Sequence, residues 1–159
     1  MPATLLSGVL AGSAVDRIVV GGPAWHELGA TAWAEFSRHA DLGTGRIAYP
    51  IEAIGSTLLT IGAAVSNYRE RDKQQRATLP LFLAVAFSII GLLLTVKAAP
   101  IMLALAQPQS SAAVAVAFKE FFFWGLYLRG AADLLAFVAQ LRALAALGGR
   151  GTGTAPAGL

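Results

Sequence analysis

Apolar residues are concentrated in four long stretches of the chain, and short polar stretches separate them. The apolar stretches cover residues 4–20, 47–65, 79–96 with a continuation past Pro100 to 106, and a last stretch from between 112 and 118 to about 147. A helix that crosses a bilayer needs about 20 mostly apolar residues. The pattern therefore predicts four transmembrane helices, the first of which ends at the glycine pair and proline of residues 21–23.

The connection between the first two apolar stretches is amphipathic. Residues 25–39 mix aromatic and charged positions, and the glycines of residues 43–45 follow them. A segment of this kind lies at a membrane interface, with its aromatic side chains toward headgroups or protein. We therefore expect a short interfacial helix in which Trp25, Trp33 and Phe36 are the buried or headgroup-facing residues.

The expected fold is all-α, a four-helix transmembrane bundle with a short amphipathic outer helix between its first and second helices. It forms a single membrane domain over residues 1–147. Residues 66–76 predict a compact polar loop, and residues 107–111 predict a turn. The remaining residues, 148–159, are rich in Gly, Ala and Thr and predict a disordered cytoplasmic tail.

The composition favours a membrane protein. Of the 159 residues, 56% are hydrophobic and 13% are charged, whereas soluble domains have about 25% charged residues. The lipid bilayer is therefore the expected partner. The net charge of +3 comes from few groups, and no basic patch interleaved with aromatic residues is present, which argues against nucleic acid. The chain has no cysteine, which excludes disulfides, thiolate metal sites and thiol nucleophiles.

The distribution of Lys and Arg predicts the orientation, because cytoplasmic loops carry an excess of both. Four basic residues lie in the loop 66–76, whereas residues 99–117 contain none. Both termini and the loop 66–76 are therefore expected in the cytoplasm, and the first and third connections outside. The bacterial-looking composition points to the inner membrane. No Lys or Arg precedes Arg17, so the first stretch is interpreted as a retained helix and not as a signal peptide.

Ionisable residues interrupt the outer half of the predicted helices. They are four acids and four bases: Asp16, Arg17, Glu52, Lys97, Lys119, Glu120, Arg129 and Asp133. A charge inside a membrane costs at least about 2.5 kcal/mol and normally faces the bundle interior. The hypothesis is an outward-facing polar pocket. The alternative is structural, because equal numbers of both signs suit mutual pairing.

Helical spacing adds detail to this hypothesis. Tyr49, Glu52, Ser56 and Thr60 follow one another at intervals of three or four residues and predict a polar stripe on the second helix. Arg129 and Asp133 form an i, i+4 pair on the fourth helix. Glu120 and Arg129 are nine residues apart and point to opposite sides of the predicted fourth helix. They can share a cavity only if that helix begins with a kink.

Two histidines, His26 and His39, lie in the first outer connection. His39 follows Glu35 by four residues and precedes Asp41 by two, and histidine with carboxylates suits a divalent metal or non-haem iron. His26 lacks the second histidine of a zincin motif. A metal on His39 or His26 is one hypothesis, and an interfacial headgroup or backbone partner is the alternative. The cofactor stays unknown, because no flavin, NAD or P-loop nucleotide signature is present.

An aromatic run occupies residues 118–124 at the outer membrane boundary. Phe121, Phe122 and Trp124 would suit a flat hydrophobic small molecule that arrives from lipid, with Arg129 and Asp133 deeper in its binding site. The alternative interpretation is an aromatic belt that anchors the helix at the interface.

Three short motifs resemble the DUF1772 group of small four-helix membrane proteins, which includes the fungal anthrone oxygenases. They are the sequence LAGSAVDR at residues 10–17, WAEFSRHAD at residues 33–41 and the Tyr49-Pro50 pair. The resemblance implies an oxygenase-type reaction on a polycyclic phenolic or similar hydrophobic substrate, without flavin or haem. The candidate residues within or near the similar stretches are His39, Asp16, Arg17 and Glu52.

Two functions follow as hypotheses. In a membrane enzyme, His39 or Glu52 would remove a proton from the substrate, and Arg17 or Lys97 would stabilise the resulting anion. Oxygen would then add directly or at a bound metal. In a binding or accessory subunit of a larger membrane complex, the charges are structural and the small residues 8–12 form an interchain contact. A homo-oligomer is compatible with both.

Overall fold

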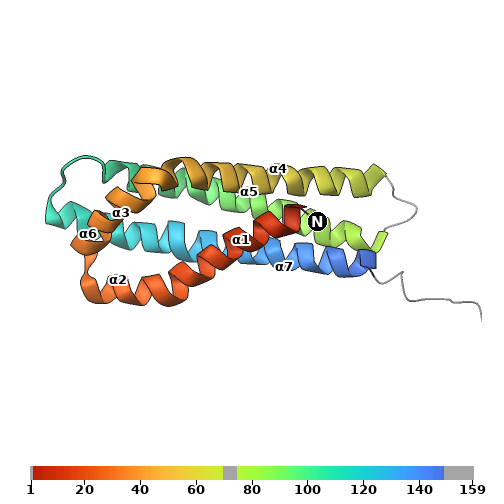
Figure 1. The fold of residues 1–159 in the computed structure, drawn as a ribbon, viewed down its shortest axis with the longest axis horizontal. Coiled ribbons are helices and arrows are strands. Elements are labelled where there is room, and N and C mark those ends of the chain that lie inside the picture. Colours follow the sequence, from red (N-terminus) through yellow and green to blue (C-terminus); the bar gives the residue numbers. More distant parts are fainter. Residues whose placement is uncertain (1, 70–74, 149–159) are drawn as a thin grey trace, which may run out of the picture.

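The computed structural model describes residues 2–69 and 75–148, and helices account for nearly all of this part (Figure 1). In chain order the elements are α1 (Pro2–Asp16), the π-helical segment η1 (Arg17–Gly21), α2 (Gly22–Leu28), α3 (Ala30–His39), the π-helical segment η2 (Ala40–Thr44), α4 (Gly45–Arg69), α5 (Gln75–Ala104), α6 (Ser111–Phe121), the π-helical segment η3 (Phe122–Leu128) and α7 (Arg129–Gly148). Residues 70–74 of the predicted loop 66–76 and residues 149–159 of the predicted tail lie outside the described residues, whereas residues 66–69 belong to α4 and residues 75–76 to α5.

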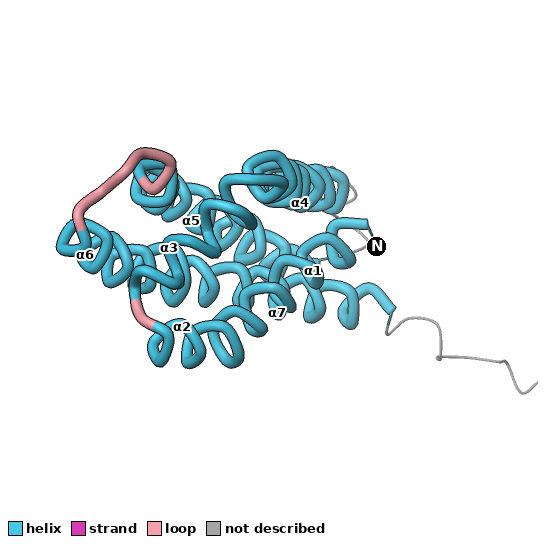
Figure 2. Tube along the Cα trace, turned by 60° about the vertical axis from the view of Figure 1, so that its left-hand side comes forward, coloured by secondary structure: helices cyan, strands magenta, loops and turns pink. Residues whose placement is uncertain are grey.

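Four helical runs in the described residues are long and apolar enough to cross a membrane. They are Pro2–Leu28, Ala30–Arg69, Arg76–Ala104 and Ser111–Gly148. This confirms the predicted all-α class and the four long apolar helices. Among the described residues, the connections at Gly29 and between α5 and α6 are short (Figure 2).

The first helical run is longer than predicted. It continues through the glycine pair and Pro23 to Leu28, and does not end at residue 21. Pro23 lies in the first turn of α2, directly after η1, where a missing backbone N–H is tolerated. The run ends at Gly29, whose φ of +89° is a conformation that glycine adopts readily and other residues do not.

The long helices pack side by side. Contacts connect α5 with α7 and α4, and α1 with α7 and α4. At the end away from the N-terminus, α3 lies against α6 (Figures 1 and 2). Side chains of α3, α6, α5 and η3 form the main apolar core around the fully buried Trp33. Trp33 therefore faces protein, whereas Phe36 on the same helix is half exposed.

Apart from the core around Trp33, many large apolar side chains lie on the outside of the molecule, and small or polar side chains lie between the long helices. Leu5 and Val96, for example, are each 72% exposed. The buried polar residues between the helices include Ser7, Ser56, Thr57, Thr60, Ser88 and Gln140. Small and polar residues at helix contacts, with apolar residues outward, are typical of helices surrounded by lipid.

Candidate functional site

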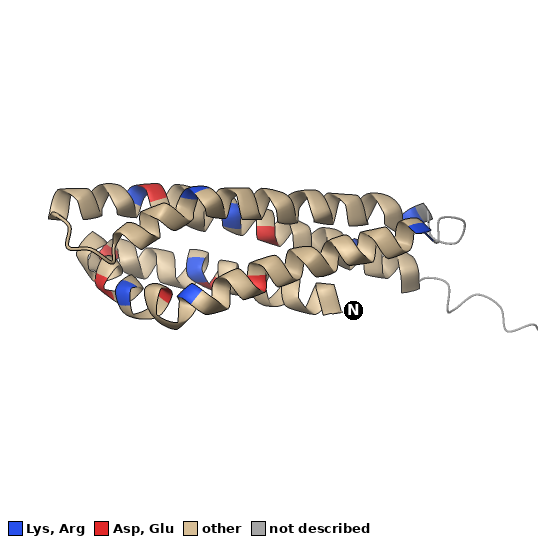
Figure 3. Ribbon diagram, turned by 90° about the horizontal axis from the view of Figure 1, so that it is seen from above, with Lys and Arg blue, Asp and Glu red and all other residues tan. Residues whose placement is uncertain are grey.

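A polar cavity of about 40 Å³ lies between α1, η1, α4, η3 and α7. Its ionisable lining residues are Arg17, Glu52, Arg129 and Asp133, and the phenol of Tyr49 joins them. Four of the eight ionisable residues expected in the outer half of the helices therefore meet at one place. Among the described residues in Figure 3, the acidic ones lie in the middle and left-hand part of the molecule, and the charged ones at the right-hand end are basic.

Arg17 is the most highly connected residue of the cavity. Its Nη2 donates to Asp41 Oδ1 at 2.6 Å, and also donates to the hydroxyl of Tyr49. The guanidinium carbon lies 4.8 Å from the centroid of the Tyr49 ring, within the range of a cation–π contact. Asp41 is buried. The first helical run is thereby tied to η2 and to the first turns of α4.

Asp41 is a residue of this site that the sequence analysis missed. It was considered only as a neighbour of His39, yet its side chain binds Arg17 from 24 residues away. Both residues lie within the two short motifs of residues 10–17 and 33–41. Spacing along the chain alone could not have paired them.

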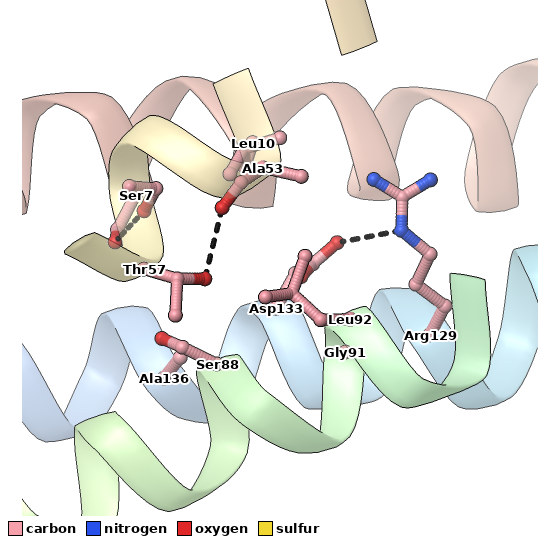
Figure 4. Close-up of a pocket in the computed structure, with 11 residues that line it drawn as sticks. Ser7, Leu10, Ala53, Thr57, Ser88, Gly91, Leu92, Arg129, Asp133 and Ala136 are labelled. Carbon is pink, nitrogen blue, oxygen red and sulfur yellow. Dashed lines mark hydrogen bonds and ion pairs between the residues drawn. The ribbon is translucent and has the colours of Figure 1, made fainter. Parts of the chain in front are cut away.

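Arg129 and Asp133 form the predicted i, i+4 pair, with 3.7 Å between Nε and Oδ2 (Figure 4). The gap is longer than a hydrogen bond, so each group keeps the capacity to bind another partner. Asp133 lies close to α5, because a Cβ placed on Gly91 would come within 3.0 Å of its Oδ1. The absence of a side chain at residue 91 therefore makes room for this carboxylate.

Glu52 differs from the other acids of the cavity. It lines the same wall as Arg17 and Arg129. Within residues 2–69 and 75–148 no hydrogen bond or ion pair engages its carboxylate. The cavity thus combines a carboxylate without a close partner and two guanidinium groups, which is a set of groups that can accept a proton and stabilise an anion.

The polar stripe predicted on the second helix continues inward from Glu52. Ser56 and Thr60 are buried. A void of about 10 Å³, roughly the size of one water, lies beside Ser56 and the Arg129–Asp133 pair (Figure 4). The stripe therefore faces the interior along its whole length, as the spacing predicted.

Four other ionisable residues do not line the cavity. Asp16, Lys97, Lys119 and Glu120 are all exposed. Asp16 is not among the buried residues of α1. On α5, the buried residue at this level is Ala98, and its neighbour Lys97 is exposed. The expectation that Asp16 and Lys97 share a pocket with Glu52 is therefore wrong.

The histidines lie away from the cavity as well. The side chain of His39 is 80% exposed, and its Nε2 lies 3.1 Å from Glu35 Oε1. The ring of His26 packs edge-on against Phe118 and Phe122, with centroids 5.2 and 4.9 Å apart. No group of three or more His, Asp or Glu side chains in the described part of the chain could hold a metal ion. The metal hypothesis on His39 or His26 gains no support from this geometry.

Most of the aromatic run packs into the protein core, whereas Phe123 is half exposed. Phe121 and Phe122 are buried against Trp33 and Phe118, and Trp124 packs against the same cluster. None of the three aromatic residues predicted to bind substrate lines the polar cavity, whereas Arg129 and Asp133, which were also predicted to bind substrate, do. Gly125 and Leu126 of η3 supply its apolar wall instead.

Comparisons with known proteins identify no similar protein. No protein-family model matches the chain, and no curated protein or solved structure shows significant similarity to it.

Proposed function

We propose that the protein is an integral protein of a bacterial inner membrane, a four-helix bundle with α3 at the outer interface. Both termini and the connection between α4 and α5 face the cytoplasm. The exposed apolar side chains on the four long helices support this placement. Basic residues lie at the end of the molecule where α4 ends and α5 begins, and they support this orientation (Figure 3). The polar cavity then lies in the outer half of the membrane.

The proposed activity is an oxygenase-type reaction on a hydrophobic, phenol-like substrate. The observation that carries it is Glu52, a carboxylate without a close partner that shares a cavity with Arg17 and Arg129. Charged groups are costly in a membrane and usually mark functional sites. The family resemblance of residues 10–17 and 33–41 supports the same reaction class.

The chemistry assigned to the cavity is proton removal followed by stabilisation of an anion. Glu52 takes a proton from an acidic C–H of the substrate, and the guanidinium groups of Arg17 and Arg129 stabilise the enolate-like anion that remains. Molecular oxygen then adds to the anionic carbon. When a CH₂ group becomes C=O, one oxygen atom enters the product and the other leaves as water.

The size of the cavity sets a condition on this proposal. About 40 Å³ accommodates one or two water-sized groups and no polycyclic ring. The helices around the cavity must therefore separate to admit a polycyclic substrate. Ile18 of η1 lies close to Gly130 of α7, so this close approach has to widen if these two segments are the ones that separate.

The test is oxygen consumption by the purified protein with anthrone-like phenols. Replacement of Glu52 by Gln should lower turnover at least about 100-fold, the usual contribution of a general base. Glu120→Gln and His39→Ala are the controls, because both residues are exposed and lie outside the cavity. Normal turnover of Glu52→Gln at equal folded yield would eliminate the mechanism.

A non-catalytic accessory subunit is the second candidate. Arg17 pairs with Asp41, and Arg129 lies beside Asp133, so much of the charge is neutralised internally. Gly12 on α1 has open space in front of it, as a contact with another chain requires. Native mass measurement in mild detergent tests this candidate. A stable complex with an unrelated chain that Gly12→Leu disrupts would favour it over the enzyme.

A further inference from the structure

Three internal spaces follow one another along the bundle. They are the polar cavity, the small void of about 10 Å³ beside it, and a large cavity of about 230 Å³ near the start of α1 and the end of α7 (Figures 1 and 4). Along α4 their walls use residues 49–52, 53–57 and 60–67 in turn. The polar cavity and the small void share Arg129 and Asp133, so these two spaces adjoin there.

The first and the last of these spaces reach the surface. In the wall of the polar cavity, 25% of the Arg17 side chain and 22% of the Arg129 side chain are exposed. Ser66 and Leu147, in the wall of the large cavity, are exposed as well. Water can therefore enter the bundle from both of its ends.

Four polar side chains lie between the small void and the large cavity. Ser7 and Ser56 line the small void, and their hydroxyls are 2.8 Å apart. Thr60 and Gln140 line the large cavity. The amide nitrogen of Gln140 donates to Ser7 at 2.8 Å and to Thr60 at 2.7 Å, so this side chain bridges the two spaces. None of the four residues is more than 3% exposed. We call this group the plug.

The hydrogen bonds of the plug give a proton no way past Gln140. A hydroxyl can accept one proton and release another, so Ser7 and Ser56 can pass protons between them. The amide nitrogen of Gln140 only donates, and its oxygen Oε1 has no hydrogen-bond partner among the described residues. The hydroxyl of Thr60 donates to the carbonyl oxygen of Ser56 and not toward the large cavity.

The groups around the small void, in contrast, suit the passage of a proton. Asp133 lines both the void and the polar cavity, and its carboxylate can take up and release a proton. The hydroxyl of Ser88 has no partner within the described part of the chain. The pair of Ser7 and Ser56 uses only one of its two hydroxyl protons. A void of this size accommodates one water, which could connect these hydroxyls with Asp133.

We propose that the interior of the bundle is a proton path from the polar cavity to the large cavity, and that Gln140 holds this path closed. Displacement of the Gln140 side chain would let water join the small void to the large cavity. Polar and ionisable groups within membrane helices often mark proton pathways. The proposal rests on the membrane placement proposed above and not on the reaction assigned to Glu52.

The test is proton influx into liposomes that contain the full-length protein and a trapped pH-sensitive dye, driven by a potassium gradient with valinomycin. Liposomes with the wild-type protein should be no leakier than protein-free liposomes. Gln140→Ala removes the bridging amide and leaves room for water. It should raise the influx at least about tenfold, as expected when the moving proton gains one hydrogen bond. Gln140→Leu keeps most of the volume without a polar group, so it should stay closed.

Two results would overturn the proposal at this stage. An unchanged influx in Gln140→Ala would mean that the plug only holds the helices together, as polar side chains in membrane bundles can do. A leaky wild-type protein would mean that Gln140 does not close the path. Gln140→Ser, which is also smaller than glutamine, replaces Gln140→Ala if that variant does not fold.

Matched variants show whether protons follow this path. Phe137→Ala removes a larger side chain from the same contact of α7 with α1 but leaves the plug in place, so it should not leak. Ser88→Val replaces a hydroxyl of the small void with methyl groups. Added to Gln140→Ala, it should return the influx to the wild-type level. A leak in Phe137→Ala, or no effect of Ser88→Val, would indicate loosened packing and would refute the path.

Flotation of the liposomes separates this proposal from the membrane placement. Protein that does not float with the lipid would refute both. Protein that floats, with no leak in Gln140→Ala, would refute the proton path alone. Turnover of Glu52→Gln, whether normal or lost, does not affect either result.

Discussion

Arg17 and Asp41 form an ion pair of 2.6 Å that joins two parts of the chain 24 residues apart. The side chain of Asp41 is buried, and three quarters of the Arg17 side chain is buried as well. The pair links η1 to η2, the π-helical segments on either side of α2 and α3. It therefore holds the short helices α2 and α3 against the long ones.

Removal of Asp41 should destabilise the protein. Asp41→Ala leaves the Arg17 guanidinium with only the Tyr49 hydroxyl, and loss of one partner of a buried pair is costly. We expect the free energy of unfolding in detergent to fall by about 2 to 4 kcal/mol. Glu35→Ala is the control, because the pair of Glu35 with Arg38 is exposed, and it should leave the unfolding midpoint unchanged. Equal unfolding curves for the two variants would contradict a structural role for the Arg17–Asp41 pair.

Two substitutions of Gln140 should show whether side-chain shape or charge at this position matters more for the stability of the protein. Gln140→Leu removes the two donated hydrogen bonds but also removes the unpaired oxygen, so the change in stability should stay within about 1 kcal/mol. Gln140→Glu places a carboxyl group where Thr60 already donates to Ser56 and cannot donate to it. We expect a larger loss for Glu than for Leu in thermal unfolding. The reverse order would show that a carboxyl group at residue 140 finds a hydrogen-bond partner, contrary to the assignment of Thr60 as an acceptor only.

Two glycines of α1 should respond differently to the same substitution. A Cβ at Gly8 would lie 3.1 Å from the ring of Phe137, whereas nothing lies within 4 Å of a Cβ at Gly12. Both variants to Leu gain the same helix propensity, so their difference measures packing. Gly8→Leu should be about 1 to 3 kcal/mol less stable than Gly12→Leu in detergent unfolding. Equal stability would mean that α1 and α7 separate easily.

The proposed orientation can be tested with single cysteines, because the natural chain has none. Gln107→Cys and Gly148→Cys lie at opposite ends of the molecule, at exposed positions. A membrane-impermeant maleimide added to intact spheroplasts should label the cysteine at residue 107 and not the one at residue 148. Labelling of the two cysteines should become equal after the membrane is permeabilised. The opposite pattern in intact cells would reverse the assignment of the two faces.

The four helices could be predicted from the sequence because long apolar stretches are a local property. Their ends were harder to place. Pro23 follows two glycines and indicates a break, but a proline in the first turn of a helix is tolerated, and the chain continues to Gly29. Which of these two outcomes occurs depends on the packing of the residues that follow.

The candidate site could be predicted where polar residues recur on one helix face. Glu52, Ser56 and Thr60 repeat at helical spacing, so their common inward face was visible in the sequence. Lys97 stands alone in a helix that is apolar on every side, and an isolated charge gives no indication of the rotation of its helix. The contact of Arg17 with Asp41 depends on how distant segments pack, which no local pattern encodes.

The π-helical segment η3 determines how the two halves of the fourth long helix, α6 and α7, are rotated relative to each other. A π-helical turn holds one residue more than an α-helical turn, so an extra residue is taken up within residues 122–128 while the faces of α6 and α7 stay nearly in phase. Deletion of a single residue there would let the helix run as an uninterrupted α-helix with little rotation of α6 relative to α7. Phe118 would then stay against Trp33, so the apolar core at that end would tolerate the loss of one residue from the chain.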